Sequence, residues 1–475
     1  MKIEQIYTGC LAQGAYYIES NGEVAIIDPL REVQQYVDKA DKDQAKIKYI
    51  FETHFHADFV SGHVTLAEKT GAPIVYGPNA NPTFKAHIAQ DGEVFQLGNI
   101  TITALHTPGH TMESTTYLLK DENGKDHAIF TGDTLFLGDV GRPDLAQKAA
   151  SLTQEQLAAT LYHSLRDKIM PLADDVIVYP AHGAGSACGK NLSKETVGTL
   201  GDQKQTNYAL RADMTEAEFV KEVTDGLLPP PAYFPLNVKL NKEGYDNVEN
   251  IIQNNQALQP NDFEVLADES GALVLDVRSA ADFAQGHIPG SIFIGLDGQF
   301  APWVGALITD IKQPILIIAP EGREQECIIR LSRVGYDNSL GYLAGGFNAW
   351  KNAGKEYDTI QQVTASELET AMNTGDITIF DVRKPGEFNA SHIQYKNLNH
   401  TPLDFLNDHL AAFPTTGNFY IHCAGGYRSL IAASILKARG YHNMIDVIGG
   451  FGAIKNTGIA LEDNSCTSTC SSNLK

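Results

Sequence analysis

Short apolar runs alternate with longer stretches of mixed polarity along most of the chain. Residues 23–28 and 49–53 are two such runs near the start, and they predict buried strands. The longer stretches between the runs predict helices, and strands that alternate with helices are typical of α/β domains. A chain of 475 residues is too long for a single hydrophobic core, so we expect about three domains.

The second half of the chain contains an internal repeat. Residues 274–278 read Val-Leu-Asp-Val-Arg and residues 379–383 read Ile-Phe-Asp-Val-Arg, and each is followed by a Phe and a His-Ile pair at matching positions. Each copy continues with a second apolar run, a loop and a glycine pair, which begins 26 residues after the loop in both copies (319 to 345 and 423 to 449). Equal spacing at several anchors predicts two duplicated α/β domains with parallel sheets, at residues 258–358 and 363–462.

The other boundaries follow from local composition. We expect one domain at residues 1–240, a linker at residues 241–257 and a flexible tail at residues 463–475, where Ser, Thr and Asn dominate. Residues 227–259 contain Pro229, Pro230 and Pro231, and proline fixes φ and removes a backbone donor. This stretch is therefore predicted to be a linker or docking arm without a helix.

The overall negative charge argues against two classes of binding partner. The formal net charge is −22, with 43% hydrophobic and 20% charged residues. Nucleic acids and membrane surfaces favour basic patches, so neither is an expected partner. The first residues do not form a signal peptide, no apolar run reaches the roughly 18 residues of a spanning helix, and the six cysteines are scattered. These features predict a cytoplasmic protein in a reducing compartment.

Candidate metal ligands lie at the ends of several predicted strands in the first 240 residues. The string Thr-His-Phe-His-Ala-Asp-Phe begins at Thr53, directly after a strand, and further His and Asp residues follow in turns and at strand ends. Such a constellation favours a metal site over polar residues that merely satisfy backbone groups in turns. The candidates are His54, His56, Asp58, His110, Asp133 and His182.

Residues 1–240 resemble a metallo-β-lactamase-fold persulfide dioxygenase. The matching strings are THFHADFVSGH from Thr53, TPGHT from Thr107, FTGDTLF from Phe130, GRPD from Gly141 and PAHG from Pro180. The resemblance implies an αββα fold and one mononuclear Fe(II) per chain. It also implies that His54, His110 and Asp133 hold the iron, and two histidines with one carboxylate are the ligand set of non-haem iron(II) oxygenases.

One residue departs from the family pattern. Phe59 stands where many members have a histidine, and a phenyl ring cannot bind a metal, so a second metal position loses a ligand. His56, Asp58 and His182 are then expected to be neighbours of the metal site that hold water, hydrogen-bond to the ligands or position the substrate.

Arg142 and Cys188 are the other candidates in this domain. Arg142 is the best cation to bind substrate or orient a carboxylate, and a structural pair with Asp144 is an equal alternative. Cys188 lies in a glycine-rich loop beside Lys190, and a nearby cation favours a thiolate that can form or receive a persulfide. The alternative for Cys188 is a small buried residue, which is a common environment for cysteine.

Cys423 lies between an apolar run and a helix-like stretch in the second repeat. A cysteine in this position lies over a helix N-terminus among backbone N–H groups, which lower the thiol pKa and stabilise an anionic persulfide. The segment His-Cys-Ala-Gly-Gly-Tyr-Arg-Ser resembles the rhodanese active-site loop Cys-x-x-Gly-x-Arg. The resemblance implies that Cys423 carries sulfur and that Arg428 is its charge partner; an inert buried cysteine is the alternative.

The first repeat lacks these residues. Ala319 stands in the place of the cysteine and Glu324 in the place of the arginine, so we expect an inactive rhodanese-like scaffold. Cys327 follows in an apolar helix and is expected to be buried. Cys466 and Cys470 lie in the polar tail and are expected to be incidental, with metal binding or sulfur relay as the alternative.

The combined resemblance implies a non-haem iron persulfide dioxygenase in sulfide detoxification, which oxidises a low-molecular-weight thiol persulfide with O2 to sulfite and thiol. Cys423 would transfer sulfur to sulfite to give thiosulfate, or work in reverse. The thiol is left open among glutathione, coenzyme A, bacillithiol and polysulfide, and the family favours a homodimer or homotetramer. The alternatives are a glyoxalase II-like metallo-hydrolase with a sulfurtransferase domain, and a non-catalytic sulfane-sulfur carrier.

Overall fold

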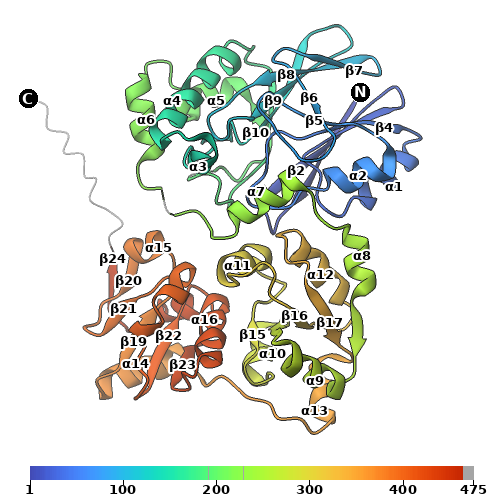
Figure 1. The fold of residues 1–475 in the computed structure, drawn as a ribbon. Helices are drawn as coiled ribbons and strands as arrows, with labels where there is room; N and C mark the ends of the chain where they lie inside the picture. Colours follow the sequence, from blue (N-terminus) through green and yellow to red (C-terminus); the bar gives the residue numbers. More distant parts are fainter. Residues whose placement is uncertain (191, 228, 464–475) are drawn as a thin grey trace, which may run out of the picture. The chain divides into compact units, whose positions relative to one another are not determined.

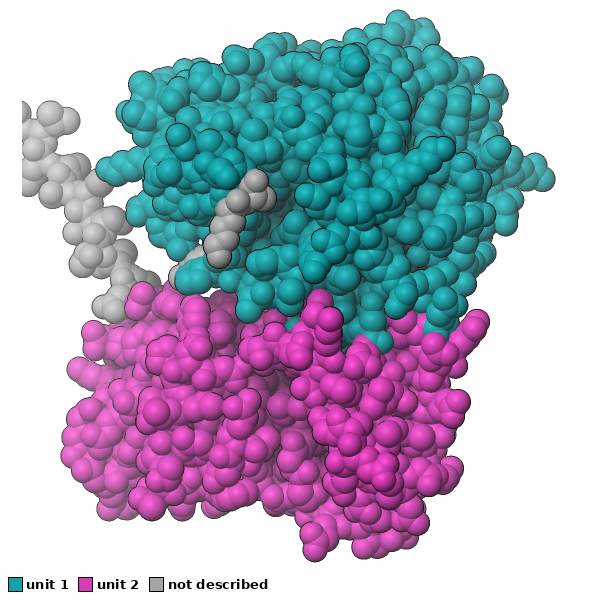
Figure 2. Space-filling view, viewed as in Figure 1, with its two compact units in different colours: residues 1–250, 329–337 teal, residues 251–328, 338–475 magenta. Residues whose placement is uncertain are grey.

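The computed structural model describes residues 1–190, 192–227 and 229–463 (Figure 1). The chain divides into two compact units, which Figure 2 distinguishes by colour. Unit 1 contains Met1–Asn250 and Ile329–Asp337, and unit 2 contains Ile251–Ile328 and Asn338–Lys475. The predicted tail from residue 464 onwards, with Cys466 and Cys470, lies outside the described residues.

Unit 1 is built on two six-stranded sheets. The first sheet has the order β1 (Lys2–Thr8), β2 (Gln13–Ser20), β3 (Glu23–Ile27), β4 (Lys46–Phe51), β5 (Ile74–Tyr76) and β6 (His87–Ile88). The second has the order β12 (Gly198–Thr199), β11 (Ile177–Pro180), β10 (Asp126–Gly132), β9 (Thr115–Lys120), β8 (Ile100–His106) and β7 (Val94–Leu97). Side chains of both sheets share one core, which includes Tyr16, Phe51, Phe95, Tyr117 and Phe130.

Helices cover the outer faces of both sheets (Figure 1). On the first sheet, α1 (Gln34–Lys42) and α2 (His63–Thr70) pack through apolar residues such as Tyr36 and Leu66. On the second sheet, α4 (Gln154–Ser164) and α6 (Glu216–Thr224) pack through residues such as Leu161 and Phe219. The unit also has α3 (Gln147–Ala150), η1 (Leu165–Ile169), α5 (Leu200–Thr206) and η2 (Tyr208–Leu210). The predicted αββα layering is confirmed.

The stretch predicted to be a linker without a helix contains two helices, so this prediction is wrong. They are α7 (Phe234–Glu243) and α8 (Val248–Asn254). The second residue of α7 is Pro235, in the first turn, where a missing backbone donor and a fixed φ are tolerated. The proline run at 229–231 precedes the helix rather than interrupting it, and α7 buries Phe234, Asn237 and Asn241.

Ile329–Asp337 belongs to unit 1 although the residues on both sides of it belong to unit 2. The fully buried side chain of Arg31 donates two hydrogen bonds to the Asp337 carboxylate, each 2.7 Å long, and one of 2.6 Å to the Ser332 carbonyl oxygen. Arg333 pairs with Glu32, and its carbonyl oxygen accepts a hydrogen bond from Val60 N (2.7 Å). Hydrogen bonds and ion pairs thus join the segment to the unit that carries the candidate metal ligands.

Unit 2 contains two five-stranded parallel sheets. The first has the order β13 (Gln256–Leu258), β17 (Ser339–Leu343), β16 (Ile315–Ile318), β14 (Leu273–Asp276) and β15 (Ile292–Phe293). The second has the order β18 (Gln362–Val363), β23 (Met444–Val447), β22 (Phe419–His422), β19 (Thr378–Asp381) and β21 (Leu398–His400). A separate antiparallel pair joins β20 (Ser391–Ile393) to β24 (Leu461–Asp463).

The helices of the repeats follow the strands in the predicted alternation. They are α9 (Pro260–Ser270), α10 (Ala280–Gln285), α11 (Phe300–Leu307), α12 (Glu324–Ser332) and α13 (Gly346–Asn352) in the first repeat. The second repeat has α14 (Ala365–Thr374), α15 (Pro385–Ala390), η3 (Leu403–Asp408), η4 (Leu410–Ala412), α16 (Tyr427–Ala438) and α17 (Gly450–Ile454). The predicted parallel α/β architecture of this half is confirmed.

The two repeats also match in side-chain geometry. The Phe283 and His287 rings stack with centroids 4.1 Å apart, and the Phe388 and His392 rings stack at the same 4.1 Å. The Asp of each Asp-Val-Arg string accepts hydrogen bonds from the guanidinium of its own Arg. Among the described residues, no helix has both the length and the apolar character needed to cross a membrane.

Candidate functional site

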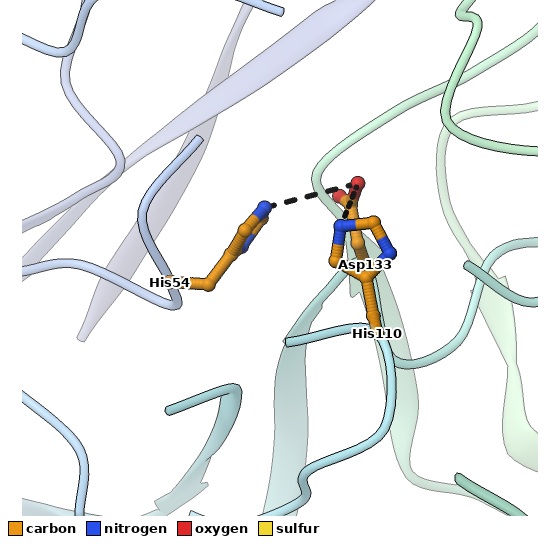
Figure 3. A group of neighbouring side chains, drawn as sticks. All are labelled: His54, His110 and Asp133. Atoms are coloured by element: carbon orange, nitrogen blue, oxygen red, sulfur yellow. Dashed lines mark ion pairs between the residues drawn. The ribbon is translucent and has the colours of Figure 1, made fainter. Parts of the chain in front are cut away.

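Three buried side chains from different parts of the sequence meet in unit 1 (Figure 3). His54 follows β4, His110 follows β8, and Asp133 comes directly after β10. His110 Nε2 lies 3.3 Å from Asp133 Oδ2, and His54 Nε2 lies 3.8 Å from the same oxygen. These are the three residues that the sequence resemblance assigned to the iron.

Neighbouring groups fix both imidazoles with Nε2 turned toward Asp133. His110 Nδ1 donates a hydrogen bond of 2.8 Å to the carbonyl oxygen of Arg142. The Thr53 hydroxyl donates to Asp28 (2.8 Å), so it accepts from His54 Nδ1 at 3.0 Å. This arrangement, in which the outer ring nitrogen is hydrogen-bonded, is usual for histidines that bind a metal.

The side chains have the chemical character of metal ligands. Both carboxylate oxygens of Asp133 are buried and have no hydrogen-bond partner within the described part of the chain. A buried carboxylate without a partner is costly, and a divalent cation would compensate it. Burial, together with the nearby His56 and His110, holds the pKa of His54 well below its usual range, which keeps the imidazole in its neutral, metal-binding form.

The three predicted neighbours lie beside this group, and His56 differs from the other two. His182 Nε2 lies 3.3 Å from Asp58 Oδ2 and 3.5 Å from Asp133 Oδ1. His56 Nε2 instead faces two carboxylates, Asp28 Oδ1 at 3.1 Å and Glu52 Oε2 at 3.6 Å. Burial lowers the pKa of His56, but these carboxylates outweigh burial and raise it to about 9.

Glu52 and Asn241 are site residues that the sequence reasoning missed. Asn241, on α7, donates 2.8 Å hydrogen bonds to the carbonyl oxygens of His56 and Phe59 and accepts one from Ser61 N. It therefore fixes the loop that carries the ligand string. Phe59 itself is fully buried, with its ring centroid 4.4 Å from that of His56.

The structure agrees with one of the two roles predicted for Arg142. Its guanidinium makes two hydrogen bonds of 2.7 Å to the Asp144 carboxylate, which is the structural pair. Its carbonyl oxygen holds His110, as described above. Its use as a substrate-binding cation stays a prediction.

Cys188 is brought to the metal ligands, but its environment differs from the predicted one. Its sulfur lies within 4.8 Å of the ligand atoms of Asp133 and His182. The cation expected beside it is engaged elsewhere, because Lys190 Nζ donates to the carbonyl oxygens of Glu222 and Asp225. Burial raises the pKa of the Cys188 thiol well above its usual value, and the Asp58 and Asp133 carboxylates act in the same direction.

Cys423 occupies the loop between β22 and α16, as the sequence predicted. Its buried Sγ accepts a hydrogen bond of 3.1 Å from Gly426 N, one of the backbone donors at the start of the helix. Arg428 makes two hydrogen bonds to the Glu387 carboxylate (2.6 and 2.7 Å), so its closest charge partner is Glu387. Glu387 was not singled out in the sequence because it lies 36 residues before the cysteine.

The corresponding loop of the first repeat has a different chemistry. Ala319 follows β16, and Glu324 begins α12. Arg323 pairs with Glu326 and Asp297. Cys327 is fully buried in α12, as predicted.

The first repeat nevertheless contacts the loop of the second. The Tyr427 hydroxyl donates a hydrogen bond of 2.8 Å to the Gly295 carbonyl oxygen. The Tyr427 ring lies so close to Gly298 that a Cβ atom at Gly298 would be 2.3 Å from Tyr427 Cζ. Tyr427 lies between Gly426 and Arg428, so the first repeat supports the segment that carries Cys423.

Comparison with known proteins agrees with this arrangement. The model of the metallo-beta-lactamase superfamily matches residues 8–182, and that of the rhodanese-like domain matches residues 259–353 and 364–457. The cytoplasmic hydroxyacylglutathione hydrolase of Arabidopsis thaliana is 33% identical over 38% of this chain and 67% of its own length. The mitochondrial persulfide dioxygenase ETHE1 of Bos taurus is 30% identical over 46% of this chain and 78% of its own length.

A solved structure extends the similarity beyond the first domain. The metallo-beta-lactamase from Staphylococcus aureus subsp. aureus COL has 33% sequence identity and a TM-score of 0.65, over 72% of this chain and 99% of that one. The chain therefore belongs to the metallo-beta-lactamase superfamily, and it joins the domain of that superfamily to two rhodanese-like domains.

Proposed function

We propose that the protein is a mononuclear non-haem iron persulfide dioxygenase coupled to a sulfurtransferase at Cys423. The observation that carries the proposal is the buried set of His54, His110 and Asp133, whose carboxylate has no hydrogen-bond partner among the described residues. Two histidines and one carboxylate leave open positions on iron(II), as in other oxygenases with this ligand set. The similarity to the persulfide dioxygenase of Bos taurus supports the same reaction class.

The proposed reaction takes R-S-SH, O2 and water to R-SH and sulfite with release of two protons. Iron(II), when bound, supplies the redox chemistry that activates O2, which zinc does not have. The imidazoles of His54 and His110 and the carboxylate of Asp133 would hold the ion. All three side chains are nearly fully buried, which excludes bulk water from the ligands.

The proposed sulfur transfer occurs at Cys423. The terminal sulfur of a Cys423 persulfide is attacked by sulfite, so that a sulfur–sulfur bond forms in thiosulfate and the bond to the Cys423 sulfur breaks, leaving a thiolate. The Gly426 N–H group, 3.1 Å from Sγ, stabilises that thiolate. The reverse direction uses the same groups, with thiosulfate as the donor.

A glyoxalase II-like hydrolase is the second candidate, because the Arabidopsis thaliana relative bears the name hydroxyacylglutathione hydrolase. That reaction depends on a metal-activated water, commonly between two metal ions. Phe59 cannot bind a metal, so a second metal ion would lack one ligand. This makes the hydrolase the less favoured candidate.

Metal content and O2 uptake test the proposal. Anaerobically purified full-length protein, reconstituted with iron(II) and given glutathione persulfide, should hold one iron per chain, consume O2 and release sulfite. Asp133→Ala should lose iron and lower O2 uptake by about 100-fold or more, because a ligand is removed. Asp126→Ala, which changes a partly exposed carboxylate at the other end of β10, should retain both the iron and the O2 uptake.

Cys423→Ser separates the two activities. It should abolish sulfurtransferase activity and leave O2 uptake unchanged, whereas Cys327→Ser, in the matching helix of the first repeat, should retain both. Two zinc ions per chain, thioester hydrolysis and no O2 uptake would reject the dioxygenase in favour of the hydrolase. A protein with neither activity that still accepts sulfur at Cys423 would be a sulfur carrier.

A further inference from the structure

The first repeat contains a cleft at the amino ends of its strands β14 and β16. The volume of the cleft is about 560 Å³, which lies in the range of small-molecule binding sites. Leu273, at the start of β14, and Gln313, shortly before β16, lie in its wall. The loop that corresponds to the Cys423 loop begins at Ala319, at the carboxyl end of β16, so the cleft is separate from that loop.

The second repeat has the same elements but larger side chains at the corresponding positions. Asp276 of β14 corresponds to Asp381 of β19, and this offset of 105 residues also relates α9 to α14. Three small residues of the cleft wall then correspond to Met372, Ile377 and Tyr395, namely Ala267, Ala272 and Gly290. All three large side chains pack against the hydrophobic core of the second repeat. The cleft is therefore space that side chains fill in the other copy.

The first repeat replaces a polar contact of Tyr395 but not its ring. The Tyr395 hydroxyl accepts a hydrogen bond of 3.2 Å from Ile377 N. The corresponding backbone group of the first repeat is Ala272 N, which donates to Ser270 Oγ at 3.3 Å. This backbone donor thus has a partner within the chain, and what the cleft offers a ligand is space for an apolar ring.

The wall of the cleft combines aromatic and acidic side chains. Phe263 and Trp350 belong to the hydrophobic core of this repeat and line the cleft. Trp350 Nε1 donates a hydrogen bond of 2.7 Å to the carbonyl oxygen of Glu356, which holds Glu356 beside the indole. The charged side chains in the described wall are all carboxylates, from Glu264, Asp268 and Glu356. Aromatic faces and carboxylates both attract an organic cation.

We propose that this cleft binds an arylalkylamine, a small molecule in which a short chain joins an apolar aromatic ring to an ammonium group. The ring takes the space that Tyr395 fills in the second repeat and packs against Trp350. The ammonium group pairs with the carboxylates of Asp268 and Glu356. The same carboxylates repel anions such as coenzyme A and thiosulfate, so the cleft is distinct from the sites of the proposed sulfur chemistry.

The fluorescence of Trp350 reports on the cleft directly. The chain has two tryptophans, so Trp303→Phe in the full-length protein leaves Trp350 as the single indole. Titration with phenethylamine should change the emission of Trp350 saturably, with a dissociation constant of about 1 mM or lower for a ligand of this size. Phenylacetate, which has the same ring and a negative charge, should not bind.

Ala267→Met tests the position of the ligand, because it introduces the residue of the second repeat. It should weaken phenethylamine binding by at least about 10-fold, since the added atoms occupy the space of the ligand. Ala281→Met, the same change at an exposed position of α10, should bind as the wild type does. Ala272→Ile makes the same test if Ala267→Met fails to fold. Unchanged affinity in the folded variant would overturn the inference.

Glu356→Gln tests the charge of the ligand. It should weaken phenethylamine binding by about 2- to 5-fold, the effect of one exposed ion pair, and leave the binding of uncharged phenethyl alcohol unchanged. Glu269→Gln, which changes an exposed carboxylate of α9 outside the wall, is the control. Equal binding of phenethylamine and phenylacetate, or a dissociation constant above about 1 mM for phenethylamine, would overturn the inference.

The inference does not rest on the proposed function, and the two can fail separately. O2 uptake and sulfurtransferase activity, measured on the same preparations, report on the proposed function. A protein that has both activities and does not bind phenethylamine would refute only this inference.

Discussion

Asp446, on β23, is a buried carboxyl group, and burial destabilises its ionised form. Burial raises its pKa to about 6, and Gln362 Nε2 donates a hydrogen bond of 2.9 Å to its Oδ2. The unfolded chain, with an ordinary pKa of about 3.9, binds fewer protons than the folded chain between these two values. Stability should therefore increase as the pH falls from 7 through 6, and decrease as the carboxyl ionises.

Asp446→Asn should remove this dependence. At pH 8 the variant should be more stable than the wild type by up to about 3 kcal/mol, the free energy of a shift of about two pKa units, and by much less at pH 5. Urea unfolding at the two pH values measures the difference. The exposed Asp268→Asn in the same unit is the control, and an equal gain at both pH values would contradict the assigned pKa.

Most candidate residues of the metal site could be located in the sequence because they follow strands in short recognisable strings. The structure places His54, His110 and Asp133 together, with Asp58 and His182 beside them. The orientation of each side chain could not be read in the same way. Whether His56 faces a metal or Glu52 depends on rotamers and on neighbours from other strands, which no spacing encodes.

At the level of elements, the loop before α16 depends on the segment that follows β15 in the other repeat. Tyr427 is held by Gly295, which follows β15, and its ring leaves no space for a side chain at Gly298. The first repeat, which lacks the catalytic cysteine, thus supports the loop that carries Cys423. The sequence predicted a scaffold but not the residue that it supports.

Gly298→Ala should displace Tyr427 and with it the backbone donors around Cys423. We expect sulfurtransferase kcat/KM to fall by about 10- to 100-fold, because small displacements at a reacting centre have large effects on rate, and O2 uptake to stay unchanged. The rate of Cys423 alkylation should fall in the same variant.

Gly375→Ala is the matched control for that experiment. A Cβ atom there would meet its nearest neighbour at 3.7 Å, and the backbone is extended. Wild-type sulfurtransferase activity in Gly298→Ala would show that the contact with Tyr427 is not needed for the loop.

The duplicated domains were predictable because their anchors recur at fixed spacing, and parallel α/β sheets follow from alternating elements. The helices α7 and α8 were missed because the proline run at 229–231 suggested a linker. Pro235 lies in the first turn of α7, where a helix tolerates proline. Asn241, on the buried face of α7, binds the loop that carries His54 and His56. Tertiary packing thus outweighed local composition here.

At the scale of the whole molecule, unit 1 is completed by Ile329–Asp337. Asp337→Asn should weaken the pair with the fully buried Arg31 and destabilise unit 1 by about 3 kcal/mol, because an unpaired buried charge is costly. Chemical denaturation of the iron-loaded and iron-free protein measures this. Asp213→Asn, in an exposed pair with Arg211, should cost less than about 1 kcal/mol.

A fragment of residues 1–250 should be destabilised more than the Asp337→Asn variant. It lacks the carbonyl oxygen of Arg333 that accepts from Val60, the residue after Phe59 in the ligand loop. The fragment should bind iron more weakly than the full chain. Equal affinity and equal stability in the fragment would show that the segment adds nothing to unit 1.

The discontinuity of unit 1 has a consequence for how the protein is made. The ribosome must synthesise about 90 further residues after residue 250 before Asp337 exists, which takes on the order of 5–20 seconds at about 5–20 residues per second. During that interval the Arg31 guanidinium lacks two of its acceptors, the Asp337 carboxylate and the Ser332 carbonyl oxygen. Metal capture by the growing polypeptide is therefore expected to lag behind translation of the ligands themselves, and to finish only when the first rhodanese-like domain has largely emerged.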